Sequence, residues 1–439
     1  MPYRNVAIIG AGASGLAAAA LLRENGLRVT VLEARERLGG RMSTIDRFGV
    51  PFDEGAQWIH YSNSNEWTQV AAKMRIPTRP APDSRHYLAK AGVVSGEAYT
   101  AVSEEQETLD EAICEVGSAG HDVPAGKAVE SRQDDKYYPQ AAAMVGSLEE
   151  ATDLWSFSCV DRSRSGSGLS GGNMVPVSGL GVLAESYALR LQEAGVEFCR
   201  KAPVKEIDYS RRGSITILAD SVGRLEVDAV LVTVPTGVLN ADRIRFVPKL
   251  PPEVADNFQL LPLGSYHKVA LLFDGAATQP TQYRVLLPES TTEKNASIVR
   301  SGLYGTNTYA TNFQGTQKNL AVVYFGGSMA SALSRLEHSA SVEAAVEVAR
   351  DVFGEDAIAQ LSKETPPYVT SWGADPYSLG AYSFARPGGG AARIILADQP
   401  LKMAGVFFGG EALSINAYGT IGGAFQAGLS AAGRMLAMS

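Results

Sequence analysis

The opening stretch of the chain constrains its fold more than any other. An apolar run over 6–9, short enough for a buried strand, leads into Gly10, Gly12 and Gly15 and then the helix-forming run 16–24. In this G-x-G-x-x-G spacing the first glycine permits a tight turn. The second lets the backbone approach a pyrophosphate, and the third allows close helix–strand packing. Since a helix N-terminus also favours phosphate, the stretch predicts a βα unit that binds a dinucleotide.

A second predicted strand, 27–32, ends on Glu33. A carboxylate at this place can accept hydrogen bonds from both hydroxyls of an adenosine ribose. The glycine-rich run 34–41 follows at once, and a plain NAD-binding fold does not need it. Its backbone N–H groups and the guanidinium of Arg35 or Arg41 could reach the same pyrophosphate. An ordinary βαβ unit with tight turns is the alternative.

The composition is that of a globular protein with more than one core. The chain has 439 residues, 45% hydrophobic and 20% charged, which is too long for one compact core. The net charge of −8 argues against nucleic acid or an anionic membrane as a partner. No apolar run is long enough to span a bilayer, and no signal peptide opens the chain. We therefore expect a cytoplasmic protein, either a monomer or a homodimer.

The three cysteines, Cys114, Cys159 and Cys199, are scattered and form no C-x-x-C or Cys/His cluster. They therefore predict neither a disulfide framework nor a metal site. Buried or incidental thiols in a reducing compartment are the expectation.

The order of the predicted elements indicates an α/β protein, mixed in its second half. The stretch 225–234 reads as one nearly continuous apolar strand of a buried sheet, 136–154 is helix-compatible, and 342–353 predicts an amphipathic helix ended by Gly354. We expect a discontinuous Rossmann-like domain and an inserted substrate domain of mixed sheet plus helices. The first takes residues 1–82, 175–245 and 370–439, and the second takes 83–174 and 246–369.

Four separated motifs give the chain a specific resemblance. They are 6–15 with Glu33; 32–41; 230–239, Val-Leu-Val-Thr-Val-Pro-Thr-Gly-Val-Leu; and 409–428, which opens with Gly-Gly-Glu. In this order the chain resembles the flavin-dependent amine oxidases: monoamine oxidases, polyamine oxidases and the amine-oxidase domain of lysine-specific histone demethylases. In its motifs it is most similar to the polyamine (spermine and acetylpolyamine) oxidases.

The resemblance implies FAD rather than NAD as the cofactor. It places the ADP half of FAD along Gly10, Gly12, Gly15, Glu33, Arg35, Gly39, Gly40 and Arg41. It places the ribityl chain and isoalloxazine ring along Gly55, Ala56, Gln57, Trp58, Val204, Trp372, Glu411, Thr420 and Ile421. Monoamine oxidases carry a flavin-bonded cysteine just before the residue that matches Tyr382, and this chain has Ala381 there. We therefore expect FAD to bind non-covalently.

The reaction that the resemblance implies is oxidation of a small, polyamine-like amine to an imine. A hydride equivalent passes from the carbon next to nitrogen to flavin N5, the imine is hydrolysed, and O₂ reoxidises the flavin to give H₂O₂. An ammonium ion has no lone pair to assist C–H cleavage. The site should therefore favour the neutral amine, as an apolar aromatic pocket does.

The resemblance also implies residues near the reacting atoms. Lys268 matches the lysine that reaches flavin N5 through a water, with a surface lysine at a strand edge as the alternative. Tyr382 matches one wall of an aromatic cage. Thr420 stands where monoamine oxidases and many plant polyamine oxidases have a second tyrosine. The second wall of the cage is therefore open in this chain, and Tyr418 is a nearby candidate for it. His60 is similar to a histidine of spermine and acetylpolyamine oxidases that could bind a secondary amine; a backbone-satisfied histidine is the alternative.

Two further questions stay open in the sequence. Glu149, Glu150 and Asp153 could anchor a polyamine, although a surface helical face is preferred for them. An L-amino-acid oxidase shares the fold but needs an arginine for the substrate carboxylate, for which Arg85 and Arg300 are unmarked candidates. An FAD-binding protein without oxidase turnover is a second rival. A plain NAD dehydrogenase would leave the last motif unexplained.

Overall fold

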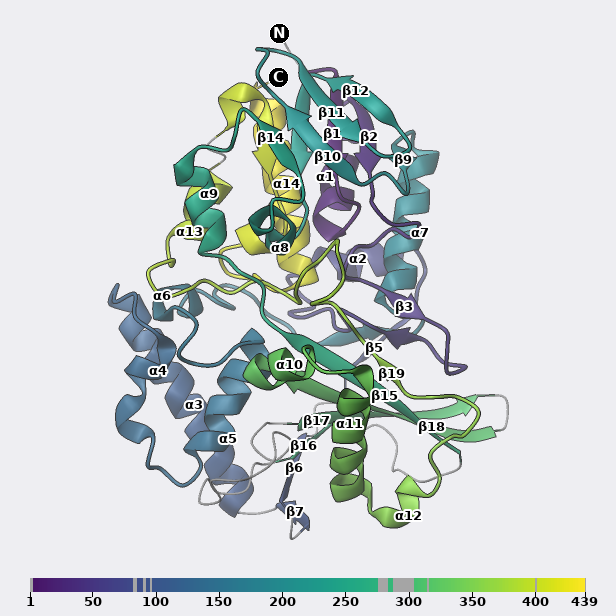
Figure 1. Cartoon of the computed structure of the whole chain (residues 1–439), viewed down its shortest axis with the longest axis vertical. Coiled ribbons are helices and arrows are strands. Elements are labelled where there is room, and N and C mark those ends of the chain that lie inside the picture. The colour runs from purple at the N-terminus through teal and green to yellow at the C-terminus, as the bar shows by residue number, and fades with distance from the viewer. Residues whose placement is uncertain are drawn as a thin grey trace.

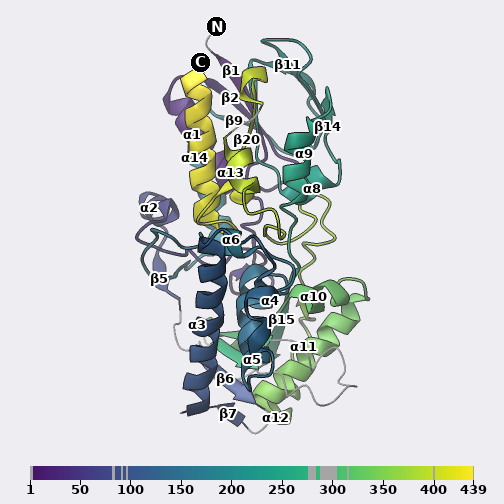
Figure 2. The ribbon, with the colours of Figure 1, turned by 90° about the vertical axis from the view of Figure 1, so that its left-hand side faces the viewer.

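A computed structural model describes residues 3–81, 85–89, 92–94, 97–274, 283–286, 304–313, 316–398 and 401–438. The molecule is elongated, with both termini at one end and the long helix α3 (Glu97–Ser118) toward the other (Figures 1 and 2). Three larger sheets and the helices around them make up a mixed α/β fold, which confirms the predicted class. The division of the chain into two domains stays a prediction.

The opening stretch forms the centre of a parallel five-stranded sheet. The strand order is β20 (Val406–Phe408), β13 (Ala229–Val232), β1 (Asn5–Ile9), β2 (Arg28–Leu32) and β9 (Glu197–Cys199). Apolar side chains are buried on both faces, as a parallel sheet requires. Helices α1 (Ala13–Glu24), α14 (Ile421–Met438) and α7 (Leu180–Glu193) pack together on one face (Figure 2). The two ends of the sequence therefore meet beside β1.

The prediction of a single strand over 225–234 is wrong, because the structure divides this stretch between two sheets. β12 (Gly223–Val227) belongs to a four-stranded sheet with β11 (Ile215–Ala219), β10 (Val204–Asp208) and β14 (Arg245–Val247), whereas β13 belongs to the five-stranded sheet. The break falls at Asp228. Its carboxylate accepts hydrogen bonds from the N–H groups of Arg4 and Asn5 at 2.7 and 2.8 Å. These hydrogen bonds therefore hold Asp228 at the point where the chain passes from one sheet to the next.

The third sheet carries seven strands. Their order is β19 (Tyr368–Val369), β15 (Tyr266–Asp274), β18 (Thr316–Gly326), β17 (Tyr304–Phe313), β16 (Tyr283–Leu286), β6 (Arg85–Ala89) and β7 (Gly92–Val94). All pairs are antiparallel except β16 with β6. Helix α11 (His338–Phe353) packs its apolar residues against Val269, Leu271 and Phe273 of β15. It ends at Gly354, whose φ of 85° confirms the predicted stop.

The helices of the stretch 97–162 form a group at the left of the lower half of Figure 1. Beside α3 lie α4 (Ala125–Ala128), η1 (Glu130–Arg132), α5 (Tyr138–Ala143), the π-helix η2 (Met144–Glu150) and α6 (Cys159–Arg162). The helix predicted over 136–154 is wrong at its end: it widens into the π-helix and stops before Ala151, whose left-handed φ of 54° ends it. Among the described residues, no helix has the length and apolarity needed to cross a membrane.

The short elements are β3 (Thr44–Ile45), β4 (Phe52–Asp53), α2 (Glu66–Lys73), β5 (Thr78–Pro80), β8 (Met174–Pro176), α8 (Thr236–Asn240), α9 (Pro252–Gln259), α10 (Gly327–Leu333), α12 (Glu355–Ile358), α13 (Ala392–Ala397), η4 (Lys402–Ala404) and η5 (Glu411–Leu413).

Candidate active site

The glycine loop after β1 has the conformation that its sequence predicts. Gly10 has a φ of 103°, and a side-chain carbon at Gly15 would lie 2.0 Å from the Gly10 carbonyl oxygen. Glycine is therefore needed at both places. The loop opens α1, whose first N–H groups have no partner within the helix. The buried Ser14 Oγ in this first turn has no hydrogen-bond partner. The loop thus presents unused donors at a helix N-terminus.

The second glycine-rich run lies directly on the first. The Gly39 N–H donates to the Ala11 carbonyl at 2.9 Å, and Gly12 and Gly39 form a parallel bridge. Glu33 is buried between the runs, where its two carboxylate oxygens accept the N–H groups of Ala11 and Arg35, each at 2.9 Å. The fold therefore brings the predicted acid and both loops to one place.

A cavity of about 930 Å³ extends from these loops to the edge of the seven-stranded sheet. Apart from Gly15, which packs beneath the loop, every residue to which the resemblance gives a cofactor or catalytic role lines it. These are Gly10, Gly12, Glu33, Arg35, Gly39, Gly40, Arg41, Gly55, Ala56, Gln57, Trp58, His60, Val204, Lys268, Trp372, Tyr382, Glu411, Thr420 and Ile421. Residues more than 400 positions apart thus share one cavity.

Lys268 lies on the wall of this cavity and is 5% exposed, so the surface alternative is wrong. Its Nζ donates to the carbonyl oxygens of Asp53 and Gly55 at 2.8 and 2.7 Å. Burial lowers the pKa of Lys268 to about 8, although Asp53 and Glu54 oppose this shift. Burial also raises the pKa of Asp53 to about 6. Lys268 can therefore exchange its proton near neutral pH.

The aromatic wall differs from the one expected. The Tyr382 hydroxyl donates to the Glu149 carbonyl at 3.1 Å, and Tyr382 lines the cavity as predicted. Thr420 caps α14: its hydroxyl donates to the Ala417 carbonyl at 2.6 Å and accepts the Gly423 N–H at 3.0 Å. The second ring packed on Tyr382 is that of Tyr266, which the sequence analysis missed. Side chains alternate between the two faces of a strand, so the residue two positions before Lys268 is expected on the same face as Lys268. This rule would have identified Tyr266.

His60 and Trp372 both line the cavity. His60 Nδ1 is 2.9 Å from the Asn173 Oδ1, and burial lowers the pKa of this histidine. The partner of His60 is thus a side chain rather than the backbone. Trp372 donates its indole N–H to the Glu54 carbonyl at 3.0 Å. Asn173, just before β8, therefore orients the His60 ring, and the Glu54 carbonyl, just after β4, orients the Trp372 ring.

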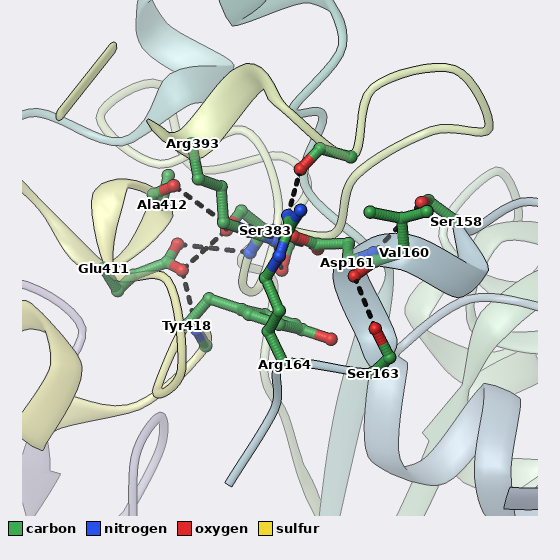
Figure 3. A network of polar contacts seen from close by, with 12 residues as sticks. Ser158, Val160, Asp161, Ser163, Arg164, Ser383, Arg393, Glu411, Ala412 and Tyr418 are labelled. Atoms are coloured by element: carbon green, nitrogen blue, oxygen red, sulfur yellow. Dashed lines mark hydrogen bonds and ion pairs between the residues drawn. The ribbon is translucent and has the colours of Figure 1, made fainter. Parts of the chain in front are cut away.

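A buried network ties Glu411 to distant segments (Figure 3). Glu411 accepts Arg41 at 3.0 Å and the Ser383 hydroxyl at 2.7 Å. Arg393, 1% exposed, donates to the same Ser383 hydroxyl at 2.8 Å and pairs with Asp161 at 2.9 Å. Burial acts to raise the pKa of Glu411, but the two arginines outweigh it, so this pKa is lowered. Glu411 is therefore held as an anion. No motif marked Arg393.

A second ion cluster, formed by Arg162 with Asp110, Glu149 and Glu150, also lines the cavity. Each of the three nitrogens of Arg162 lies within 2.8–2.9 Å of a carboxylate, from Asp110, Glu149 and Glu150. Glu150 is 3% exposed, so the surface interpretation is wrong for it; it also accepts the Tyr418 hydroxyl at 3.0 Å. Asp153 instead accepts the Ser147 hydroxyl and the Ser328 N–H. With all four groups ionised, the Arg162 cluster carries a formal charge of −2, and burial raises the pKa of Glu150.

Two predicted arginine candidates cannot be placed. Arg300 and the side chain of Arg85 lie outside the described residues. Cys114, Cys159 and Cys199 are free thiols. Within the part of the chain that the structure describes, no group of three or more His, Cys, Asp or Glu side chains could hold a metal ion.

Comparison with known proteins decides the family. A family model described as "Flavin containing amine oxidoreductase" matches residues 13–436. The chain belongs to this family. It is therefore a flavin-containing amine oxidoreductase, which confirms the resemblance in the sequence motifs.

Curated relatives and solved structures agree with this family. The chain is 28% identical to "Probable polyamine oxidase 4" of Arabidopsis thaliana, over 97% of this chain and 86% of the relative. It is 27% identical to "Lysine-specific histone demethylase 2" of Homo sapiens, over 99% of this chain but only 53% of that protein. Putrescine oxidase bound to putrescine shares the fold with a TM-score of 0.79, 20% identity and 99% coverage of both chains. Cyclohexylamine oxidase from Brevibacterium oxydans IH-35A does so with a TM-score of 0.80, 19% identity and coverage of 100% and 99%.

Proposed function

We propose that the chain oxidises small polyamine-like amines to imines, which are then hydrolysed, with FAD as a non-covalent cofactor and O₂ as the acceptor that becomes H₂O₂. One observation carries the proposal. The dinucleotide-type glycine loops and the buried amine of Lys268 line the same cavity, and aromatic rings stand beside Lys268. A nucleotide cofactor and a small apolar amine could thus be held in one enclosed space.

The residues at the glycine loops fit FAD. The unpartnered Ser14 Oγ and the first turn of α1 suit a diphosphate, and Glu33 suits a ribose. Arg35 and Arg41 add positive charge at the same end of the cavity. When bound, FAD would supply the N5 atom that accepts the hydride equivalent and the electrons that pass to O₂. Ala381 offers no thiol for a covalent bond, so the flavin would be released on denaturation.

The chain itself would position the amine and manage the proton. Tyrosine rings exclude water and lower the local dielectric, which disfavours an ammonium ion and so favours the neutral amine. Lys268 has a pKa of about 8 and would hold a water beside the reactive ring, with hydrogen bonds to Asp53 and Gly55 fixing its position. His60, held by Asn173, would face a secondary amine of the substrate.

The charges around the cavity favour an amine over an amino acid. A carboxylate clamp needs an arginine with free donors, whereas Arg162 already meets a carboxylate at each nitrogen. The net charge of −2 in the Arg162 cluster suits a second ammonium group on the substrate. The polyamine and putrescine oxidases among the similar proteins support the same substrate class.

A spectroscopic titration tests the proposal. The purified protein should show the absorbance of oxidised flavin, and spermine, spermidine, acetylated polyamines or simple amines should bleach it without oxygen. L-Amino acids should leave it coloured. A colourless protein would contradict the FAD assignment, and bleaching by L-amino acids alone would overturn the substrate class. Acid precipitation should leave the flavin in the supernatant; a yellow pellet would show a covalent bond.

A further inference from the structure

Three tyrosines form a continuous aromatic wall along the substrate end of the cavity. The ring centroids of Tyr324 and Tyr266 lie 6.0 Å apart with planes at 52°, and those of Tyr266 and Tyr382 lie 6.1 Å apart at 44°. Both spacings are typical of packed aromatic pairs. All three residues line the cavity. Tyr266 is therefore the middle member of the wall.

Strand geometry fixes where Tyr266 points. Side chains two residues apart on a strand share a face, so Tyr266 and Lys268 of β15 both reach the cavity while His267 is buried on the other side. Lys268 also pairs in register with Tyr324 of β18. The amine of Lys268 and the ring of Tyr266 are thus set in the same space by two hydrogen-bonded strands rather than by a loop.

The neighbours of Tyr266 cannot move away from it easily. The Tyr382 hydroxyl is bonded to the Glu149 carbonyl, and a side-chain carbon at Gly419 would lie only 3.1 Å from the Tyr382 ring. The Tyr324 hydroxyl donates to Gln57 Oε1 at 2.9 Å. Both outer rings are therefore held in place, and the ring of Tyr266 packs against each of them.

We propose that Tyr266 determines substrate specificity: its ring is the second aromatic wall beside Tyr382 and limits the width of the amine site to unbranched aliphatic chains. Thr420 cannot supply such a wall, because its hydroxyl caps α14. The Tyr266 ring covers the alkyl part of the amine with apolar surface and leaves the Lys268 amine accessible. This inference rests on the proposed oxidation of amines and adds the shape of the substrate.

The test compares Y266V, which removes the ring, with Y266F, which keeps it. Binding is measured by calorimetry on the dithionite-reduced protein, where no turnover occurs, with n-butylamine and a branched or aryl amine. Y266V should bind n-butylamine about tenfold more weakly and should gain relative affinity for the bulkier amine. In turnover, the KM for n-butylamine should rise while kcat changes by less than about threefold. Y266F should stay within about twofold of wild type in each measurement.

Two controls separate a wall from a general loss of structure. Y266L keeps apolar bulk on β15 if Y266V fails to fold, and it should also change the ranking of the amines. Y137V alters a tyrosine in the helical region that does not line the cavity, so it should keep the wild-type ranking.

The outcomes distinguish this inference from the proposed function. If wild type oxidises amines and the Tyr266 variants rank them as wild type does, the role of Tyr266 is wrong and the proposed function stands. If wild type binds amines without bleaching, the proposed function is wrong, and calorimetry still decides whether Tyr266 sets the width. Binding of no amine would contradict both.

Discussion

The guanidinium of Arg393 lies 3.9 Å from the centroid of the Tyr418 ring, and both residues are buried. The same guanidinium binds Ser383, the Ala412 carbonyl and Asp161. The Tyr418 hydroxyl in turn donates to Glu150. One buried cation therefore packs on the ring of Tyr418 and also binds Ser383, which donates to Glu411 (Figure 3).

Replacing Arg393 with methionine should destabilise the protein strongly. Asp161 would be left as a buried, unpaired charge, and loss of one partner of such a pair costs about 3–5 kcal/mol. Thermal unfolding should show a lower Tm, and flavin should be lost more readily because Ser383, which donates to Glu411, loses its hydrogen bond from Arg393. The matched control is R190M, which breaks an exposed pair with Glu193 and should change Tm little. A Tm of R393M equal to wild type would refute the structural role of this network.

Replacing Lys268 with methionine should slow flavin reduction or reoxidation. Met keeps the length of the side chain but cannot donate hydrogen bonds or carry a proton, and loss of such a group costs about 10²-fold or more in rate. Stopped-flow absorbance measures each half-reaction separately. K201M, on an exposed lysine paired with Glu36, is the control. Unchanged rates in both half-reactions of K268M would rule out the assigned role.

The step that depends on Lys268 should follow its unusual pKa. Its rate should change with an apparent pKa near 8. The charge of Asp53 raises the pKa of Lys268, so D53N should move the rate profile to lower pH. D220N, which alters an exposed carboxylate paired with Lys205, should not move it. Identical profiles for D53N and wild type would exclude this electrostatic coupling.

The lowered pKa of Lys268 also predicts how the free energy of unfolding depends on pH. The folded pKa of Lys268 is lowered from 10.5 to about 8, so the folded state binds fewer protons than the unfolded chain between these values. The free energy of unfolding contributed by Lys268 should therefore rise as pH increases from about 8 to 10.5, and the cost of burying its charge is fully present below pH 8. Denaturant unfolding of wild type against K268M at pH 7 and pH 10 measures this. A difference between the two proteins that is independent of pH would contradict it.

Removing Arg162 should strengthen the preference for substrates with two amino groups. R162M takes one positive charge from the Arg162 cluster and leaves Asp110 and Glu149, which line the cavity, without their paired cation. The KM for a diamine should therefore fall by about tenfold relative to a monoamine of equal length. R164M, whose guanidinium binds the Gly390 carbonyl instead, is the neighbouring control. Equal changes for diamine and monoamine would mean that this cluster does not face the substrate.

Local sequence determined the glycine-loop end of the cavity. Gly10, Gly12 and Gly15 impose a backbone conformation through sterics that act within a few residues, and strand and helix periods place Glu33 at a strand end. Lys268 could be found because a motif surrounds it. These features are encoded by neighbouring residues, so they can be read without the fold.

Only the tertiary structure decided the tyrosine-lined end of the cavity. Tyr266 and Tyr382 are 116 positions apart in sequence, and Arg162 meets Asp110 from another helix. Periodicity indicates which face of an element is buried but not which distant element packs on it. The break of the predicted strand at Asp228 has the same cause, because its partner N–H groups belong to Arg4 and Asn5. Contacts between residues far apart in the chain therefore shape the tyrosine-lined wall, while contacts between close ones shape the glycine loops.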